Sequence, residues 1–89
     1  MKNRVNRKRE KILIYLYYNQ NVPNYLASIS RKVDFTYTNL RKAIFSLESK
    51  GLLNVEHTHY QTLVSLTDSG KKLAKSFLDI QRIYDNSYS

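Results

Sequence analysis

The residues from Thr36 to Lys42 carry hydroxyl, amide and cationic groups at spacings suited to contacting nucleic acid. Hydroxyl and amide groups near the start of a helix can reach base edges, and Arg41 and Lys42, about one turn further on, can reach bases or phosphates. No acidic residue lies between Thr36 and Leu47. Because a solvated helix face usually mixes both signs of charge, this run favours an anionic partner. Its candidate contact residues are Thr36, Tyr37, Thr38, Asn39, Arg41 and Lys42.

A helix must position these groups, and the apolar spacing predicts one that ends near residue 50. Thr36 is placed to cap its start, and Gly51 is placed to end it, because glycine enters the left-handed conformation without steric cost. A shorter helix comes before it, separated by a break at residues 34–36. This order predicts a helix-turn-helix; the alternative is two core helices of a small bundle that binds no nucleic acid. The apolar face of the longer helix consists of Leu40, Ala43, Ile44 and Leu47.

The shorter helix is predicted over residues 25–33, with Asn24 as its cap. Arg31 and Lys32 face outward near the turn, where a helix that crosses the phosphate backbone would place cations. The buried side of this helix is expected to hold Leu26, Ile29 and Val33.

A basic arm over residues 1–11 leads into a first helix from about residue 6 to residue 18. Arg4, Arg7 and Lys8 could contact phosphates, or the arm could be solvated and partly frayed. The first helix is apolar nearly all round, so a second surface must cover it. That surface is either a second copy of the chain or the C-terminal helix of the same chain.

Two β-favouring runs, at residues 52–56 and 61–66, predict a hairpin. A final helix follows from Thr67 to about Tyr84, with an apolar seam of the coiled-coil kind. This seam and the first helix could together form a dimer interface, or the final helix could pack only on its own domain. The hairpin tip consists of His57, Thr58, His59 and Tyr60, and the candidate dimer residues are Ile14, Tyr15, Tyr18, Phe77, Ile80 and Tyr84.

Composition narrows the classes of partner. Fifteen Lys and Arg residues against seven Asp and Glu give a formal charge of +8, a strong bias towards phosphates or anionic lipid. The absence of cysteine excludes disulfide and cysteine–zinc frameworks, and it makes an intracellular, cytoplasmic setting the expectation. No apolar run approaches the roughly 18 residues of a membrane span, so no membrane partner is expected.

Neither catalysis nor a cofactor is expected. The sequence has no glycine-rich phosphate loop and no serine or cysteine triad signature. His57 and His59 would point the same way on a strand, but no obvious third ligand accompanies them. We therefore expect no metal site.

Two motifs give the chain a family resemblance. LESKGLL, at residues 47–53, matches the end of a recognition helix, and LTDSGKKL, at residues 66–73, matches the segment that closes a wing and opens the next helix. The chain thus resembles a winged helix-turn-helix domain, similar to MarR-like and PadR-like DNA-binding regulators and their small relatives in archaea, archaeal viruses and plasmids. The resemblance implies an α+β, mainly α fold with three helices, a two-stranded β-hairpin wing and a long C-terminal dimerisation helix. One domain would span residues 1–89, with the helix-turn-helix at 24–50, the wing at 52–66 and the C-terminal helix at 67–85.

The resemblance also implies a homodimer that places both recognition helices, residues 36–50, in successive major grooves, with the wing at the minor groove or the flanking backbone. The chain departs from this pattern in two places. Its hairpin tip carries no lysine or arginine, which leaves the wing as a backbone contact. Phe45 stands where the family usually has a polar residue, and an outward phenylalanine would suggest a protein contact within or between dimers.

The leading hypothesis is a homodimer that binds specific double-stranded DNA sequences as a transcriptional regulator. One alternative is a DNA-partition adaptor that binds centromeres and spreads along DNA, with Phe45 or the wing joining dimers. Another alternative is a winged-helix module that binds other proteins and does not read DNA.

Overall fold

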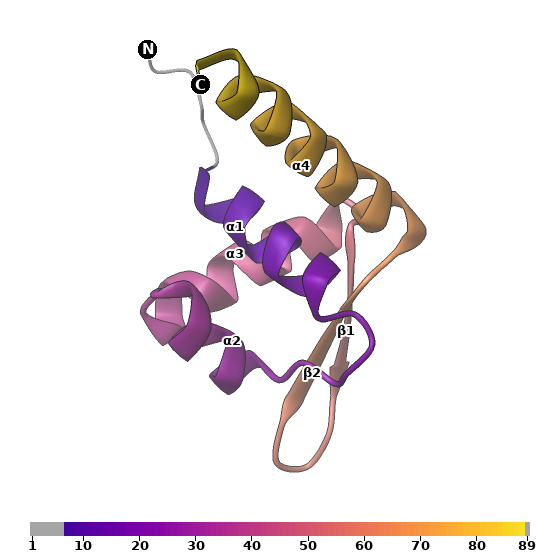
Figure 1. Cartoon of the computed structure of the whole chain (residues 1–89). Coiled ribbons are helices and arrows are strands. Elements are labelled where there is room, and N and C mark those ends of the chain that lie inside the picture. Colours follow the sequence, from indigo (N-terminus) through magenta and orange to yellow (C-terminus); the bar gives the residue numbers. More distant parts are fainter. Residues whose placement is uncertain (1–6, 89) are drawn as a thin grey trace.

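The computed structural model describes the backbone of residues 7–88 and the side chains of residues 8–85. Arg4 and the side chain of Arg7, both predicted DNA contacts, therefore lie outside the described residues. The elements follow one another as predicted, with a helix pair, a longer helix, a two-stranded hairpin and a long final helix (Figure 1). They are α1 (Arg7–Tyr18), α2 (Leu26–Val33), α3 (Tyr37–Ser49), β1 (Leu53–His57), β2 (Thr62–Leu66) and α4 (Asp68–Tyr88).

The core lies where α1, α2 and α3 meet one face of the hairpin and the first half of α4. α1 is at its centre, packed against α2, β2 and α4. This position explains why α1 is apolar nearly all round: the C-terminal helix of the same chain covers much of its surface. The most deeply buried side chains come from four of these elements and are Ile12, Leu13, Leu16, Ile29, Leu40, Ile44 and Val64.

The turn between α2 and α3 is set by three residues. Asp34 adopts the left-handed conformation, with φ of 58°, and its backbone N–H donates to the Ser30 carbonyl. The Ser30 hydroxyl donates to the Phe35 carbonyl oxygen at 3.0 Å, which fixes the exit from α2. Thr36 then caps α3 as predicted, since its hydroxyl oxygen accepts the Asn39 N–H at 3.2 Å.

α3 ends at a glycine in the left-handed conformation, as the sequence predicts. Gly51 has φ of 77°, and its N–H donates to the Glu48 carbonyl at 2.9 Å. The N–H of Leu52 donates to the Leu47 carbonyl at 3.0 Å, so the two bonds form a Schellman motif. The chain leaves α3 in a fixed direction and enters β1.

The start of α4 is tied to this same junction. The Thr67 hydroxyl donates to the Gly51 carbonyl at 2.7 Å, and the Thr67 N–H donates to the Leu52 carbonyl at 3.1 Å. Thr67 also caps α4, because its hydroxyl oxygen accepts the Gly70 N–H at 3.0 Å. A Cβ atom at Gly70 would overlap the Leu52 carbonyl oxygen, so only glycine fits there.

The prediction that Asn24 caps α2 is wrong. α2 begins at Leu26, and its N-cap residue, Tyr25, makes no side-chain capping bond. Asn24 is buried instead, and its side-chain amide donates to the carbonyl oxygens of Asn19 at 2.9 Å and Val22 at 3.0 Å. The backbone carbonyl of Asn24 accepts the Val64 N–H at 2.8 Å, and this bond holds the loop before α2 against strand β2.

α4 has two halves in different surroundings. Ala74 is fully buried against the core, and Leu73 and Phe77 are half-buried beside it. Further on, Ile80 and Ile83 are exposed as the helix continues beyond the rest of the molecule (Figure 1). The helix also runs about one turn past the predicted end at Tyr84. None of the helices described is long and apolar enough to cross a membrane.

Candidate nucleic-acid interface

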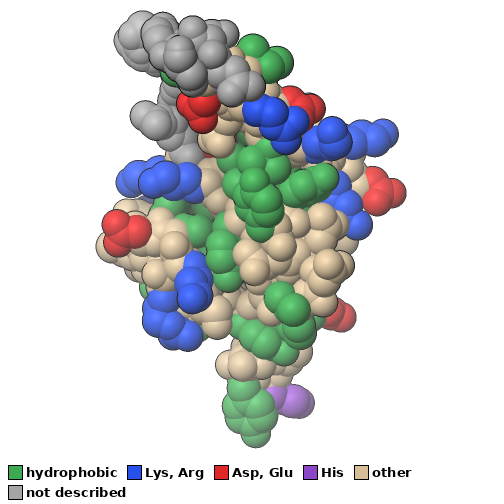
Figure 2. All heavy atoms as spheres, viewed as in Figure 1, with side chains coloured by type: hydrophobic (Ala, Val, Ile, Leu, Met, Phe, Trp, Pro, Cys, Tyr) green, Lys and Arg blue, Asp and Glu red, His purple; other side chains and the backbone are tan. Residues whose placement is uncertain are grey.

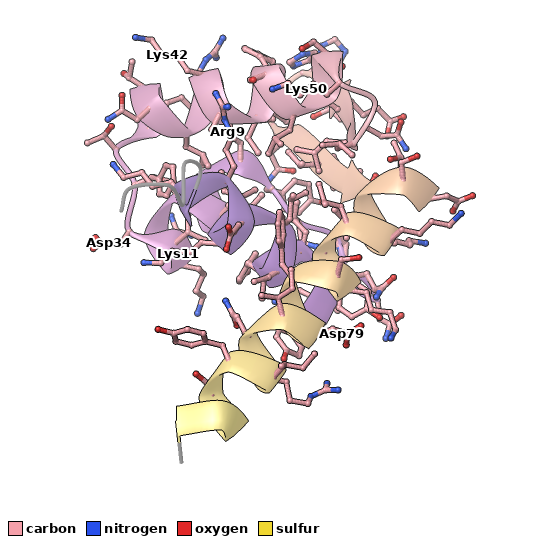
Figure 3. All side chains as sticks on the ribbon, turned by 90° about the horizontal axis from the view of Figure 1, so that it is seen from above. Arg9, Lys11, Asp34, Lys42, Lys50 and Asp79 are labelled. Carbon is pink, nitrogen blue, oxygen red and sulfur yellow. The ribbon has the colours of Figure 1, made fainter. Side chains whose placement is uncertain are left out.

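The outward face of α3 exposes the predicted contact residues. Tyr37 is 47% exposed at the start of the helix, and Lys42 points away from the body of the molecule (Figure 3). The apolar stripe of α3 faces the core, so the hydroxyl, amide and cationic groups on the opposite side of the helix can contact a ligand. The other exposed residues on this part of α3 are Thr38, Asn39 and Arg41, together with Thr36 at the cap.

Cations from two other helices flank the start of α3. Arg31 and Lys32 are exposed in the last turn of α2. Lys8 of α1 places its ammonium nitrogen 5.5 Å from the centre of the Phe35 ring, at the turn of the helix-turn-helix. The acidic residue at this turn is Asp34, whose side chain is exposed. Figure 2 shows Lys and Arg side chains over the part of the molecule where Figure 1 places α2, and others along α4.

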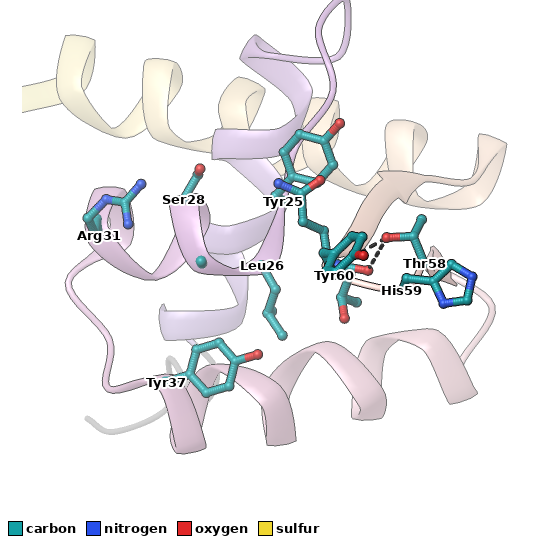
Figure 4. Close-up of a pocket in the computed structure, with 11 residues that line it drawn as sticks. Tyr25, Leu26, Ser28, Arg31, Tyr37, Thr58, His59 and Tyr60 are labelled. Atoms are coloured by element: carbon teal, nitrogen blue, oxygen red, sulfur yellow. Dashed lines mark hydrogen bonds between the residues drawn. The ribbon is translucent and has the colours of Figure 1, made fainter.

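A cleft of about 400 Å³ lies between α2, the start of α3 and the tip of the hairpin (Figure 4). Arg31 and Ser28 line it from α2, Tyr37 from α3 and Thr58 from the hairpin. One cation and several hydroxyl groups around a space of this size can hold a phosphate of a nucleic-acid backbone. The cleft therefore joins the α3 face to the hairpin tip as one surface.

The hairpin tip is aromatic and has no Lys, Arg, Asp or Glu side chain. Tyr60 is 95% exposed, and the His59 ring centre lies 6.1 Å from its ring centre. The turn is closed by Thr58, whose N–H and hydroxyl both donate to the Gln61 carbonyl, at 2.8 and 2.9 Å. Such a tip can contact a sugar–phosphate backbone through hydroxyl and imidazole groups.

The two histidines do not share one side of a strand. β1 ends at His57, which pairs with Thr62 across the hairpin, whereas His59 lies in the turn. His57 Nδ1 is 3.3 Å from the Thr62 hydroxyl oxygen, and His59 lies beside Tyr60. Within the part of the chain that the structure describes, no three His, Cys, Asp or Glu side chains gather into a group that could hold a metal ion.

Phe45 does not project outward as expected. Its ring is half-buried, with the Arg41 guanidinium carbon 5.2 Å from the ring centre. On another side the His57 ring centre lies 6.4 Å away, at an interplanar angle of 52°. Sequence reasoning missed this cluster because His57 joins it only when β1 packs on α3; the spacing of Arg41 and Phe45, four residues apart on a helix, was the available signal.

The predicted dimer residues do not form one patch within the chain. Ile14, Tyr15 and Phe77 are half-buried, whereas Ile80 and Tyr84 are exposed on the far half of α4. α1 and α4 run in opposite directions (Figure 1), so Tyr18, 70% exposed at the end of α1, lies away from the end of α4. A dimer that uses the end of α4 would thus not include Tyr18 in the same contact.

Comparisons with known proteins support the fold. No protein-family model matches the chain, and no curated protein matches it. Among solved structures, AF1382 from Archaeoglobus fulgidus superposes with a TM-score of 0.85 and 24% identity, covering 91% of each chain. MepR, a transcription regulator of the Staphylococcus aureus multidrug efflux pump MepA, superposes with a TM-score of 0.85 and 23% identity, covering 92% of this chain and 62% of MepR. A MepR–DNA complex gives a TM-score of 0.82 at 22% identity, covering 92% of this chain and 62% of MepR.

These likenesses confirm the predicted fold class, a mainly α winged helix-turn-helix with a two-stranded wing. The chain spans about three-fifths of the length of MepR, so MepR contains a large part with no counterpart here.

Proposed function

We propose that the protein binds specific sequences of double-stranded DNA as a homodimer and acts as a transcriptional regulator. The observation that carries this proposal is the exposed face of α3, which has hydroxyl, amide and cationic groups and no acidic residue between Thr36 and Leu47. The formal charge of +8 and the structural likeness to MepR, which has been solved in a complex with DNA, support it. In this role the protein is a binding protein and not an enzyme, and it needs no cofactor.

α3 would lie in the major groove as the recognition helix. Thr38, Asn39 and Arg41 are placed near its start, where side chains reach base edges. Phosphate contacts would fix the position of α3 along the duplex, because the cations around the helix-turn-helix would meet the sugar–phosphate backbone of the same DNA. The proposed phosphate contacts are Arg31, Lys32, Lys42 and Lys8, with Arg4 and Arg7 from the basic arm; Thr36 and Tyr37 complete the helix start, and Thr58, His59, Tyr60 and His57 form the wing side.

The far half of α4 is the proposed dimer contact. Ile80 and Ile83 are 57% and 65% exposed, and a helix that leaves such residues outside its own core can pair with a copy of itself. Figure 3 shows this half of α4 on the opposite side of the molecule from α3. A dimer formed there would leave both recognition helices open to DNA. Two-fold symmetry would then give half-sites about 34 Å apart, one turn of the double helix.

The proposal fits a small regulator of the MarR-like or PadR-like kind, of archaeal, archaeal viral or plasmid type, that acts on DNA in the cytoplasm. The partition adaptor, in which Phe45 or the wing would join dimers, is less well supported for Phe45, because Arg41 and His57 already contact its ring. Stoichiometry on long DNA separates the two interpretations. A regulator saturates at one or two dimers for each site, whereas an adaptor spreads.

Selection from random duplexes tests the proposed function. The purified protein is sized by light scattering, mixed with a pool of random duplexes, and the retained DNA is sequenced. We expect a dimer that enriches one palindromic motif. A protein that retains no duplex at low salt would refute DNA binding, and the protein-interaction module would then be the better interpretation.

A further inference from the structure

Arg41 is one of the residues proposed above to reach base edges, but a lone arginine at an exposed position samples many rotamers. Its side chain has several rotatable bonds, and holding it in one orientation costs conformational entropy. In this structure the Arg41 guanidinium carbon lies over the Phe45 ring, 5.2 Å from its centre. That distance is within the range of a cation–π contact, so the ring favours one orientation of the arginine.

The contact leaves Arg41 able to bind DNA. A guanidinium over a ring face presents its N–H groups at its own edge, where a guanine O6 and N7 can accept two of them. Arg41 itself is exposed, and no acidic residue between Thr36 and Leu47 competes for these donors. The ring therefore restrains the arginine without using the groups that read the base.

Phe45 is in turn held from the wing. The His57 ring lies 6.4 Å from the Phe45 ring, centre to centre. His57 is the last residue of β1, it pairs with Thr62 in the hairpin register, and its Nδ1 is 3.3 Å from the Thr62 hydroxyl oxygen. The order Thr62, His57, Phe45, Arg41 thus connects the tip end of the wing, where His57 and Thr62 are the last strand pair before the turn, to the recognition helix.

The geometry points to Phe45 as a positioning residue that orients Arg41 for reading one base pair, and to His57 as its support from the wing. This inference rests on the proposed DNA binding. It assigns Phe45 a role in specificity that lies within one chain, in place of the contact between proteins expected from the sequence. Phe45 itself need not touch DNA.

The first test needs no DNA. In the proton NMR spectrum of the full chain, the side-chain protons of Arg41 should be shifted upfield by the ring current of Phe45. Phe45→Leu should abolish that shift while the amide spectrum of the remaining chain shows a folded protein, and Phe45→Tyr, which keeps a ring, should retain it. Arg41 protons at ordinary shifts in the wild-type protein would overturn the inference, whether or not the protein binds DNA.

The second test measures specificity on the duplex motif obtained by selection. Affinities of the wild type, Phe45→Leu, Phe45→Tyr and Arg41→Ala are compared on the motif and on variants with one base pair changed. Arg41→Ala should lose discrimination at one base pair by about 10-fold or more, the range of a bidentate contact. Phe45→Leu should lose about two- to fivefold at that same base pair, the range of an exposed cation–π contact, and Phe45→Tyr should restore it.

The double variant Arg41→Ala/Phe45→Leu decides between positioning and a general structural role. If Phe45 acts through Arg41, adding Phe45→Leu to Arg41→Ala should change discrimination no further. Equal weakening on every duplex, or an added loss in the double variant, would overturn the inference while leaving DNA binding intact. A wild-type protein that binds no duplex would instead refute the proposed function, and with it any role of Phe45 in reading bases.

Discussion

Asp34 carries backbone strain at the turn of the helix-turn-helix. It has φ of 58°, a conformation that costs an L-residue about 1–2 kcal/mol, although aspartate and asparagine tolerate it better than most. We predict that Asp34→Gly raises the free energy of unfolding by about 0.5–1 kcal/mol, because the relieved strain exceeds the added freedom of the unfolded glycine. Denaturant unfolding followed by circular dichroism measures the change.

Asp34→Asn is the matched control, because it removes the charge and keeps a side chain that tolerates the left-handed conformation. Its stability should stay within about 0.5 kcal/mol of the wild type. Both variants should bind DNA more tightly than the wild type, since each removes a carboxylate beside Arg31 and Lys32. A stability gain as large in Asp34→Asn as in Asp34→Gly would show that charge, and not backbone strain, is the cause.

The two glycines are needed for different reasons, and alanine should distinguish them. At Gly70 a Cβ atom would overlap the Leu52 carbonyl oxygen, whereas at Gly51 it would meet nothing within 4 Å. We predict that Gly70→Ala lowers the free energy of unfolding by about 3 kcal/mol, as overpacking against backbone does. Gly51→Ala should lower it by only about 1–2 kcal/mol, the cost of a left-handed alanine. Equal losses in denaturant unfolding would contradict the steric argument.

At the scale of the helix, the far half of α4 makes a prediction about assembly. Ile80 is 57% exposed, so Ile80→Glu should leave the fold of one chain intact while placing a charge in the proposed dimer contact. If the proposed dimer contact buries Ile80, losing this side chain from both copies should cost the dimer about 3 kcal/mol, which corresponds to roughly 100-fold weaker association. Analytical ultracentrifugation over a range of protein concentrations measures this constant.

Arg82→Glu supplies the control on the same helix. Arg82 lies 3.7 Å from Asp79 in an exposed ion pair that is worth little to stability. Residues two apart on a helix do not face each other, so Arg82 points away from Ile80. This variant should therefore remain a dimer. If Arg82→Glu dissociates the dimer as strongly as Ile80→Glu does, net charge and not the apolar contact governs assembly.

What the sequence predicted well was local to each element. The spacing of Leu40, Ala43, Ile44 and Leu47 identified the buried face of α3, and all four side chains are buried. The cap at Thr36 was also predicted, because capping involves residues only three positions apart. Periodicity and capping depend on neighbours along the chain, so one sequence contains both signals.

What the sequence did not predict joins distant elements. Asn24 was predicted to cap α2, but its backbone carbonyl accepts the N–H of Val64 in β2, which comes later in the chain than α3. Phe45 was expected to point outward, but Arg41 and His57 contact its ring, and His57 belongs to β1 of the wing. Such contacts depend on how the helices and the hairpin pack, which periodicity does not specify.

For the whole molecule, the charge of +8 predicts strong dependence of DNA affinity on salt. If a dimer neutralises about 8 phosphates, the logarithm of affinity should fall with the logarithm of salt concentration at a slope of about −7. Fluorescence anisotropy with a labelled duplex, from low to moderate salt, measures the slope. Arg31→Ala should make the slope less steep by about 1 for each phosphate that is no longer neutralised, and a slope near zero would contradict the charge-based account.

The junction of α3, β1 and α4 has a mechanical consequence. Two hydrogen bonds from Thr67 reach Gly51 and Leu52, and Gly70 lies against the same Leu52 carbonyl. α3, proposed to read DNA, and α4, proposed to form the dimer, are therefore joined rigidly at this junction. In a dimer, α3 and α4 of each chain would therefore move together as one rigid unit. The angle between the two α4 helices at the dimer contact would then set the distance between the two recognition helices.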